Sequence, residues 1–439
     1  MYKIFIAENV PSLNKGEMAI LKGIFESVKK LGKVEFTMLS GHPDIDKSRY
    51  KNEINIIDTG KHFSFCYKNY ITKLIPSLIV FLKHLLFLIL YKIFGSNAIK
   101  FMKSELWKVY LNSDAIFMGH NGTYGIGGGF GNPIFFYHYY LPLFANILSI
   151  PIVLYGGSIN KPRIFPFLLN RLSTFALKRI NLVTLRERIS FFRLKALGVQ
   201  KNKIYVTSDL AFLLKPASIE RIEKIMKMEC IDDSYKPLIG VTVSHKIANK
   251  SFLEHGHSIS YIKHNEEFAK IIDILTDKNK HNAYVIFIPH CIGQDKLLDD
   301  RIIATDIYKL CKNKGKIKII TNEYSPEELK GLIGKFNFFL GERLHSVINA
   351  MSMFVPSIAL SYSSDTRLDI IKMIGQKKAI YYVEELNAYS LLEKINKMLL
   401  QKEKIIKELK LQIQITKEKS LLNGKLIKKM LNSLSIKNR

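Results

Sequence analysis

The chain has 439 residues, a length that suggests two or three domains. Apolar residues make up 47% of it, which is enough to build hydrophobic cores and argues against a disordered chain. Lys and Arg number 66 against 38 Asp and Glu, and the net charge of +28 attracts nucleic acid, anionic membranes or anionic substrates. No nucleic-acid-binding motif is present and the charge is spread along the chain, so we expect no nucleic-acid partner.

The cysteines and the first residues bear on the cellular compartment. Cys66, Cys230, Cys291 and Cys311 form no C-x-x-C pair and lie near no pair of histidines with zinc spacing. This pattern excludes a disulfide scaffold and an obvious structural zinc site, so we expect reduced thiols and no metal. The first residues, MYKIFIAENV, run directly into a strand-like segment without signal-peptide features, and we therefore expect a cytoplasmic protein.

The first elements in the chain form a strand–helix–strand unit. An apolar strand is expected at Lys3–Ala7, a helix over Glu17–Leu31 that ends at a glycine, and a second strand at Lys33–Leu39. The apolar segment Ile75–Gly95 comes next and has the roughly 20 residues that can span a bilayer. Lys83 at its centre is costly in lipid, which leaves three alternatives: a helix in a core, a helix on an anionic membrane surface, or a membrane span.

The same alternation continues to the end of the first half. A strand at Ala115–Met118 precedes the segment Gly119–Pro133, whose seven glycines in fifteen residues exclude regular structure. Further strands are expected at Pro151–Tyr155, Asn181–Leu185 and Ile204–Thr207. A polar stretch at Ser218–Lys236 is interpreted as the crossover between two halves.

The second half repeats the pattern of the first. Strands are expected at Leu238–Ser244, Ala283–Ile288, Lys316–Ile320, Phe336–Leu340 and Val355–Leu360. A capping box begins the helix before the fourth of these strands, with Ser325 as the cap, Pro326 at the first helical position and Glu328 three residues after the cap.

Strands that alternate with helices predict an α/β protein with two Rossmann-like domains, whose parallel sheets face a cleft. The expected domains are residues 1–215 and 236–385, followed by a basic helical tail at 386–439. From Leu400 to Arg439 the tail has 11 Lys and Arg against three Glu, with apolar residues at helical spacing. We expect the tail either to pack back on a domain with its lysines in solvent or to contact an anionic membrane.

Two cations stand at an unusual place in the segment FFLGERLHSVINAM, residues 338–351. A buried strand ends at Gly341 and a helix follows at once, so Arg343 and His345 lie in or beside the first helical turn. A helix N-terminus carries about +0.5 charge, so cations there are unfavourable unless an anion neutralises them. The pattern therefore predicts an anion-binding site. The alternative is that Arg343 pairs with an acid such as Glu342.

Other polar residues follow the ends of expected strands, where a cleft between parallel sheets binds ligands. Arg186 follows one strand and offers a planar fork suited to carboxylate or phosphate. Ser158 follows two glycines that allow close approach of a ligand, and Asp209 follows another strand. Asn14 and Glu17 lie in the turn that opens the first helix, where an acid is also favoured for structural reasons.

These segments, in this order, resemble the polysaccharide pyruvyl transferase family over most of the chain up to about residue 380. N-K-G-E-M-A-I at 14–20 resembles the family's N-x-G-D-x-A-I opening, and S-D-A-I-F-M-G at 113–119 resembles its next strand and glycine turn. Y-G-G-S-I-N, T-L-R-E-R-I-S and S-D-L-A-F resemble its G-Q-S-I-G, V-R-E-x-x-S and D-x-A-F elements. The most specific match is G-E-R-L-H-S-V-I-N-A at 341–350, which resembles G-x-R-L-H-x-x-I-x-A.

The resemblance implies a GT-B-like fold and an enzyme that transfers the pyruvyl group of phosphoenolpyruvate to glycan hydroxyls. The acceptor is expected to be a glycan or lipid-linked saccharide in cell-surface polysaccharide biosynthesis, with the first domain on the acceptor side and the second on the donor side. Residues matching those that hold phosphoenolpyruvate are Arg186, Arg343 and His345, and Leu344, Ser158 and Asn14 are grouped with them. No cofactor is implied. Asp365 stands where the family often has Lys, and Glu17 where Asp is usual.

The chemistry needs an acid, a base and positive charge for the departing phosphate. His345 either binds the phosphate or donates a proton, and Glu17 and Asp209 are the candidate bases. The alternative function with the same fold is a GT-B glycosyltransferase that uses a nucleotide-sugar. Association with the inner face of the membrane is expected to involve Ile75–Gly95 and the basic tail.

Overall fold

The computed structural model describes residues 1–50, 53–62, 70–102, 104–119, 133–159, 166–232, 234, 237–248, 260–293 and 296–437. The chain forms two compact units. Unit 1 contains Met1–Ser12, Ile24–Asp209 and Lys419–Arg439, and unit 2 contains Leu13–Gly23 and Leu210–Glu418. Most of the glycine-rich segment predicted at Gly119–Pro133, and Cys66, lie outside the described residues. Cys230, Cys291 and Cys311 are free thiols.

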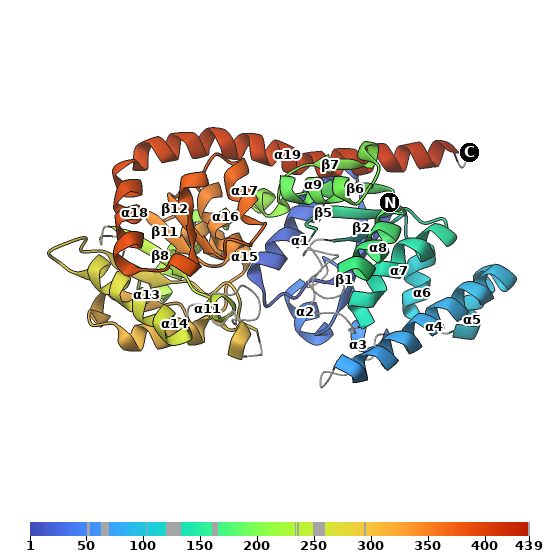
Figure 1. The fold of residues 1–439 in the computed structure, drawn as a ribbon, viewed down its shortest axis with the longest axis horizontal. Helices are drawn as coiled ribbons and strands as arrows, with labels where there is room; N and C mark the ends of the chain where they lie inside the picture. The colour runs from blue at the N-terminus through green and yellow to red at the C-terminus, as the bar shows by residue number, and fades with distance from the viewer. Residues whose placement is uncertain are drawn as a thin grey trace. The chain divides into compact units, whose positions relative to one another are not determined.

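Unit 1 is built on a parallel sheet of seven strands in the order β3-β2-β1-β4-β5-β6-β7 (Figure 1). The strands are β1 Tyr2–Asn9, β2 Val34–Ser40, β3 Asn55–Asp58, β4 Ala115–Met118, β5 Ile152–Gly157, β6 Leu182–Leu185 and β7 Ile204–Val206. Every residue of β4, β5 and β6 is buried, as expected for central strands with helices on both faces.

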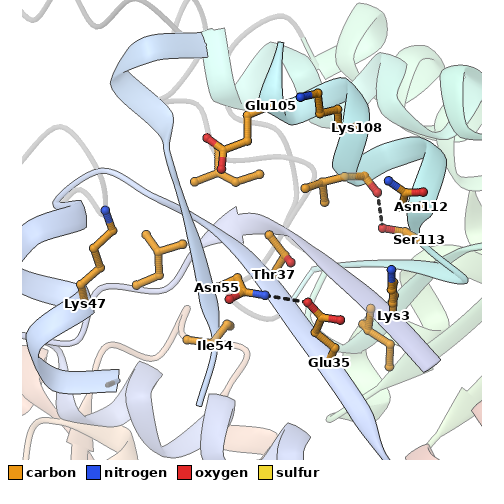
Figure 2. A pocket seen from close by; sticks show the side chains of 14 residues that line it. Lys3, Glu35, Thr37, Lys47, Ile54, Asn55, Glu105, Lys108, Asn112 and Ser113 are labelled. Carbon is orange, nitrogen blue, oxygen red and sulfur yellow. Dashed lines mark hydrogen bonds between the residues drawn. The ribbon is translucent and has the colours of Figure 1, made fainter. Parts of the chain in front are cut away.

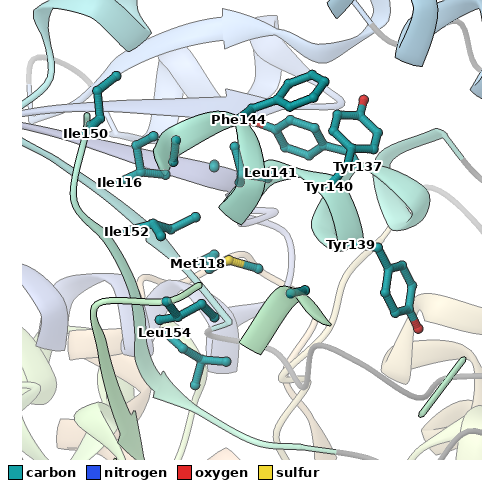
Figure 3. Packing of buried hydrophobic residues seen from close by; sticks show 14 of the residues in the cluster. Ile116, Met118, Tyr137, Tyr139, Tyr140, Leu141, Phe144, Ile150, Ile152 and Leu154 are labelled. Carbon is teal, nitrogen blue, oxygen red and sulfur yellow. The ribbon is translucent and has the colours of Figure 1, made fainter. Parts of the chain in front are cut away.

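The helices of unit 1 are short, apart from α4 and α7. They are α2 Pro43–Tyr50, α3 Thr59–His62, α4 Tyr70–Phe94, α5 Ala98–Met102, α6 Glu105–Asn112, α7 Pro133–Ile147, α8 Pro166–Leu177 and α9 Arg188–Ala196. Figure 3 shows how α7 covers the sheet: Leu141 and Phe144 lie over Ile116 of β4 and Ile152 of β5. Each of these four side chains is almost fully buried, so together they exclude water from one face of the sheet.

Unit 2 has a second parallel sheet of six strands in the order β10-β9-β8-β11-β12-β13. Its strands are β8 Leu238–Thr242, β9 Tyr284–Phe287, β10 Ile317–Ile319, β11 Phe338–Gly341, β12 Ser357–Ser361 and β13 Ile380–Tyr382. Its helices are α10 Ile219–Met228, α11 His245–Ala248, α13 Tyr261–Thr276, α14 Asp300–Leu310, α15 Pro326–Ile333, α16 Leu344–Ser352, α17 Leu368–Met373 and α18 Ala388–Leu400. The 3-10 helix η5, Leu210–Leu213, begins the longer of the unit's two segments.

The predicted α/β class with two parallel sheets is confirmed, and each predicted strand is present within a few residues of its expected position. The capping box of α15 is also present, with both of its reciprocal hydrogen bonds formed. Two strands were missed, β3 and β13, which are edge strands of four and three residues. The polar stretch at Ser218–Lys236 contains a helix, α10, which Ser218 caps and whose Ile222 and Ile225 are buried.

The domain boundaries differ from those predicted in two ways. Residues 13–23, expected in the first domain, belong to unit 2. The reason is a set of backbone contacts: Asn14 and Cys291 form an isolated β-bridge, and the Lys15 N–H donates to the His290 carbonyl at 2.8 Å. Helix α1, Lys15–Val28, therefore begins in unit 2, and its residues from Ile24 onward belong to unit 1.

The second difference is the basic tail, which is not a separate part. It forms α19, Lys402–Lys437, whose residues up to Glu418 belong to unit 2 and whose later residues belong to unit 1. The apolar residues at helical spacing are buried, including Leu409 and Ile413 at 0% and 1% exposure. In unit 1, Asn423 accepts a hydrogen bond from Thr207 at 3.1 Å. The tail therefore packs back on the protein, as the first of the two alternatives predicted.

Candidate functional site

Several polar side chains of unit 2 lie at the carboxyl ends of β8 and β11. The strand order reverses between these two neighbours, and such a switch point at the carboxyl ends of parallel strands is where α/β sheets bind ligands. The chain leaves β11 at Gly341 and enters α16 at Leu344. A Cβ at Gly341 would lie 2.6 Å from Val347 Cγ2, so the glycine lets the first turn of α16 approach the strand end closely.

Arg343 is the N-cap residue of α16 and is held by Asp300 at the start of α14. Its Nε lies 3.1 and 3.2 Å from the two Asp300 oxygens and its Nη2 lies 2.5 Å from Oδ1. Burial disfavours the charge on this guanidinium, but the Asp300 carboxylate more than offsets that cost and raises the pKa of Arg343. Among the described residues, no group accepts a hydrogen bond from Nη1, so one edge of the fork is left for another anion.

Arg343 therefore pairs with an acid, as the alternative expected, but that acid is Asp300 and not Glu342, which has other partners. Glu342 accepts from the Ser244 N–H at 2.7 Å and lies 2.6 Å from His264 Nε2. Burial opposes the charge on His264, but Glu342 outweighs it and raises the pKa of this imidazole. The hydrogen bond from Ser244 ties the end of β8 to the end of β11, and the ion pair with His264 ties α13 to the same place.

His345 lies in the first turn of α16 and is 9% exposed. The start of α1 packs directly on it: a Cβ at Gly16 would lie 2.6 Å from His345 Nδ1 and 2.8 Å from His345 Cβ. No other residue type fits at position 16 without moving the imidazole. The N-K-G-E segment and the R-L-H segment, more than 300 residues apart in the sequence, are thus neighbours in unit 2.

The N-K-G-E segment is itself ordered by hydrogen bonds. Asn14 Oδ1 accepts from the Gly16 N–H at 3.1 Å, and Asn14 Nδ2 donates to Glu17 Oε1 at 2.8 Å. Lys15 is 2% exposed and pairs with Glu323 at 2.6 Å. Asn14 therefore caps α1 and orients Glu17, so both have structural partners within the segment whose Gly16 packs on His345.

His290, a residue that was not predicted, completes this cluster. His290 follows β9 and is 1% exposed, and its Nε2 lies 3.3 Å from the amide of Asn349 on α16. Burial, together with the nearby charges of His345, Arg343 and Lys15, lowers the pKa of His290 to about 3. His290 is therefore a neutral imidazole that packs against the start of α16. No sequence motif marks His290, because its position depends on the register of β9.

Unit 1 holds the other predicted residues in a closed, buried network. Arg186 is 1% exposed and donates from Nε to Ser158 Oγ at 2.7 Å and from Nη1 to Asp209 Oδ2 at 3.1 Å. Glu187 is 0% exposed and accepts from Ser158 at 2.8 Å and from Ser190. Burial is the main reason why the pKa of Glu187 is raised.

This network gives Arg186, Ser158 and Asp209 structural partners, and the ligand-binding and catalytic roles expected for them stay predictions. The Arg186 guanidinium donates from Nε to Ser158 and from Nη1 to Asp209, so two of its three nitrogens have partners within the protein. Asp209 is 0% exposed and engaged with Arg186, which does not suit a base that must reach an acceptor hydroxyl. The three residues do come together, and what they do here is tie the ends of β5, β6 and β7 to one another.

Asp365, which stands where the family described above often has Lys, has a partner close to it in the sequence. It forms hydrogen bonds with the guanidinium of Arg367 at 2.8 and 2.9 Å and accepts from Ser361 at 2.7 Å. Burial opposes its charge, but Arg367 outweighs that and holds the pKa of Asp365 well below its usual range. The loop after β12 therefore holds an Asp365–Arg367 ion pair at the position where the family often has Lys.

Two further observations limit where the site lies. Within the part of the chain that the structure describes, no group of three or more His, Cys, Asp and Glu side chains is arranged to hold a metal ion. A hollow of about 470 Å³ in unit 1 is lined by Lys3, Glu35, Asn55 and Ser113 (Figure 2). These residues lie at the amino ends of the strands, the opposite edge from Arg186, and parallel sheets bind ligands at the other edge.

The architecture of the two sheets is that of GT-B-like enzymes, as comparison with solved structures shows. UDP-GlcNAc 2-epimerase from Neisseria meningitidis bound to UDP-GlcNAc is similar with a TM-score of 0.59 at 13% identity, covering 98% of this chain and 100% of that one. Anabaena HepE in complex with UDP-glucose is similar with a TM-score of 0.57 at 11% identity, covering 99% and 100%. Identities this low show the fold alone.

The family follows from a second comparison. The model of the polysaccharide pyruvyl transferase family matches residues 14–364, so the chain belongs to this family, as its motifs predicted. The matched range begins at Asn14 and includes the whole G-E-R-L-H segment. The amylovoran biosynthesis protein AmsJ of Erwinia amylovora is 23% identical over 442 residues, covering 98% of this chain and all of that protein.

Proposed function

We propose that the protein transfers the pyruvyl group of phosphoenolpyruvate onto two hydroxyls of a glycan or lipid-linked saccharide, forming a ketal during polysaccharide biosynthesis. Family membership supports a transferase of this kind, and a relative named for amylovoran biosynthesis supports a polysaccharide product. The observation that carries the proposal is the start of α16, where Arg343, His345 and the first N–H groups of a helix meet. We place the reaction in the cytoplasm.

Phosphoenolpyruvate carries a carboxylate and a phosphate, and the two need separate cationic partners. We assign one of them to the Nη1 edge of Arg343, whose orientation Asp300 holds in advance of binding. His345 then binds the phosphate together with the N-terminal N–H groups of α16, since all of these donors lie at one helix end. Arg186 has no part in this assignment, because its hydrogen bonds are made within unit 1.

The two acceptor hydroxyls lose two protons in the reaction, and C3 and the departing phosphate gain one each. Protonation of C3 makes a methyl group and leaves an oxocarbenium-like C2, to which an acceptor oxygen bonds. The bond from C2 to the phosphate oxygen then breaks, and a second acceptor hydroxyl closes the ketal. Of the two hydroxyl protons, one replaces the proton taken up by C3 and the other leaves with phosphate. Glu17 is our candidate base, since it lies in the segment that packs on His345.

Binding of phosphoenolpyruvate, measured by calorimetry, tests the assignment without knowledge of the acceptor. R343A and H345A should each weaken binding at least tenfold, because a charge-assisted hydrogen bond contributes about 1.5–3 kcal/mol. R221A is a matched control, since Arg221 is also held by an acid, Glu328, at 2.7 Å but lies on α10, away from the start of α16. His281→Ala, at the amino end of β9, is the imidazole control.

Turnover is then followed as phosphate release in the presence of candidate saccharides, with mass spectrometry to find a glycan that gains a pyruvyl unit. Wild-type affinity in both R343A and H345A would remove the site assignment. A UDP-sugar that raises the melting temperature, when phosphoenolpyruvate does not, would favour the nucleotide-sugar glycosyltransferase instead.

A further inference from the structure

Helix α4 exposes a continuous row of large apolar side chains. The row consists of Leu78, Ile79, Leu82, Leu85, Leu86, Ile89 and Ile93, each between 37% and 65% exposed. At about 100° per residue these positions cover an arc of about 120° along one side of the helix, over a length of about 24 Å. We call this row the apolar stripe. Phe94 and Phe101, which lie 5.3 Å apart between ring centroids and are also exposed, continue it into α5.

The opposite side of α4 is fixed to unit 1. Phe87 is 0% exposed and stacks on Trp107 of α6 at 3.9 Å between ring centroids. His84 is 4% exposed, and its Nδ1 lies 2.9 Å from the hydroxyl of Tyr140 on α7. Figure 1 shows α4 at the edge of the unit with α5 and α6 beside it. The helix is therefore a two-sided element whose inner side is packed and whose outer side is open.

These contacts distinguish between the three alternatives for this segment. The stretch Ser77–Phe101 has 25 residues and is apolar enough to cross a bilayer. Only 22% of its most apolar window is buried within the protein. A plain core helix would not leave the whole stripe in water. A membrane span would have to separate His84 and Phe87 from their partners and move Lys83 into lipid. A helix lying on a membrane surface fits both sides as they are.

The charge around the stripe is of one sign. From Thr59 to Ser104 the sequence has seven lysines and no Asp or Glu. Lys83 and Lys92 are exposed and fall on opposite edges of the stripe on a helical wheel, and Lys100 is exposed on α5. Lysines at both edges of an apolar face allow the ammonium groups to remain at the headgroups while their stems contact the acyl boundary.

We infer that the apolar stripe of α4 is a docking surface for an anionic phospholipid bilayer, in which the helix lies along the plane of the membrane. The stripe has no polar group inside it and has lysines at both of its edges, which is the pattern of helices that lie in the interface of an anionic membrane. A second copy of this chain would bring the edge lysines of two helices together. The inference does not depend on the proposed reaction.

Sedimentation of the full-length protein with lipid vesicles tests this inference. The protein should bind vesicles of equal parts phosphatidylglycerol and phosphatidylcholine at least tenfold more tightly than phosphatidylcholine alone, with affinity that falls as salt rises. L82N/L86N/I89N should lower the affinity for the anionic vesicles at least tenfold. K83Q/K92Q/K100Q should lower it by about 100-fold, since each lysine near an anionic surface contributes roughly fivefold.

Matched controls carry the same changes elsewhere on exposed helical positions. I219N/I262N/L411N replaces three apolar residues of unit 2 that are 65%, 70% and 61% exposed, and K410Q/K417Q/K419Q removes three charges from α19. Both controls should bind as the wild type does, and all four variants should keep the wild-type melting temperature within 2–3 °C or so, because the altered side chains face water.

Three results would overturn the inference. The first is no binding to anionic vesicles at low salt. The second is an equal loss of binding in the control variants. The third is a dimer, detected by light scattering, that L82N/L86N/I89N converts to a monomer, because the stripe would then be an interface between two copies of the chain.

Discussion

The contact between Gly16 and His345 makes a sharp prediction about the site. Replacing Gly16 by Ala adds one methyl group 2.6 Å from His345 Nδ1, where real contacts are near 3.4 Å, so the imidazole must move by about 0.8 Å. Displacements near 1 Å in a site cost on the order of 100-fold in rate. G16A should therefore lower kcat/KM for pyruvyl transfer, and the affinity for phosphoenolpyruvate, by about 10- to 100-fold.

The fold should tolerate the same change. Alanine in place of glycine within a helix gains roughly 1 kcal/mol, while overpacking costs about 1–3 kcal/mol, so G16A should unfold within about 2 kcal/mol of the wild type. G315A is a control, because nothing lies within 4 Å of a Cβ at Gly315. Urea denaturation of both variants separates a local displacement from a loss of folded protein.

A double-mutant cycle decides whether the effect passes through His345. In the H345A background there is no imidazole to displace, so adding G16A should change the affinity for phosphoenolpyruvate by less than about twofold. An undiminished effect of G16A in that background, or wild-type affinity in G16A alone, would refute the argument that Gly16 is small in order to seat His345.

Other expectations concern stability. A Cβ at Gly424 would lie 1.8 Å from the Ser27 carbonyl oxygen, so G424A should destabilise the protein by at least 1–3 kcal/mol or so, although Gly→Ala stabilises most helices. Burial lowers the pKa of Lys330 to about 7, below an unfolded value of roughly 10.4, so the unfolded chain binds more protons between these values. The stability contributed at this position should rise by about 1.4 kcal/mol per pH unit above pH 7 and be lost as the pH falls. Arg186→Met leaves buried carboxylates unpaired and should cost about 3–5 kcal/mol.

Each of these stability predictions has its own check by urea denaturation. Q414A, on the exposed side of α19, is the control for G424A and should leave the free energy of unfolding unchanged or raise it. If Q414A destabilised the protein as much as G424A, the contact with the Ser27 carbonyl would not be the cause. In K330M, the free energy of unfolding should lack the rise with pH that Lys330 gives to the wild type. Parallel curves of unfolding free energy against pH for wild type and K330M would contradict a neutral Lys330. A wild-type free energy of unfolding in R186M would show that the carboxylates of this network find other partners.

Much of the fold could be predicted because its strands and helices follow from the pattern of residues close together in the sequence. Runs of apolar residues of strand length, separated by helical spacing, predicted the two parallel sheets. The capping box at Ser325 was readable because both of its hydrogen bonds join residues three apart. The edge strands β3 and β13 escaped prediction because three or four residues give too short a pattern, and α10 because its polar face hides the buried Ile222 and Ile225.

The site was predictable only in part, for the same reason. The sequence by itself placed Arg343 and His345 at a helix N-terminus, because a glycine and a helical period follow a buried strand within a few residues. It could not show that Asp300, 43 residues away, orients Arg343, or that Gly16 seats His345. It also could not show that Arg186 is enclosed by Ser158 and Asp209. These pairings depend on which strand ends lie side by side, and strand order is decided by the packing of the whole sheet, which no local periodicity encodes.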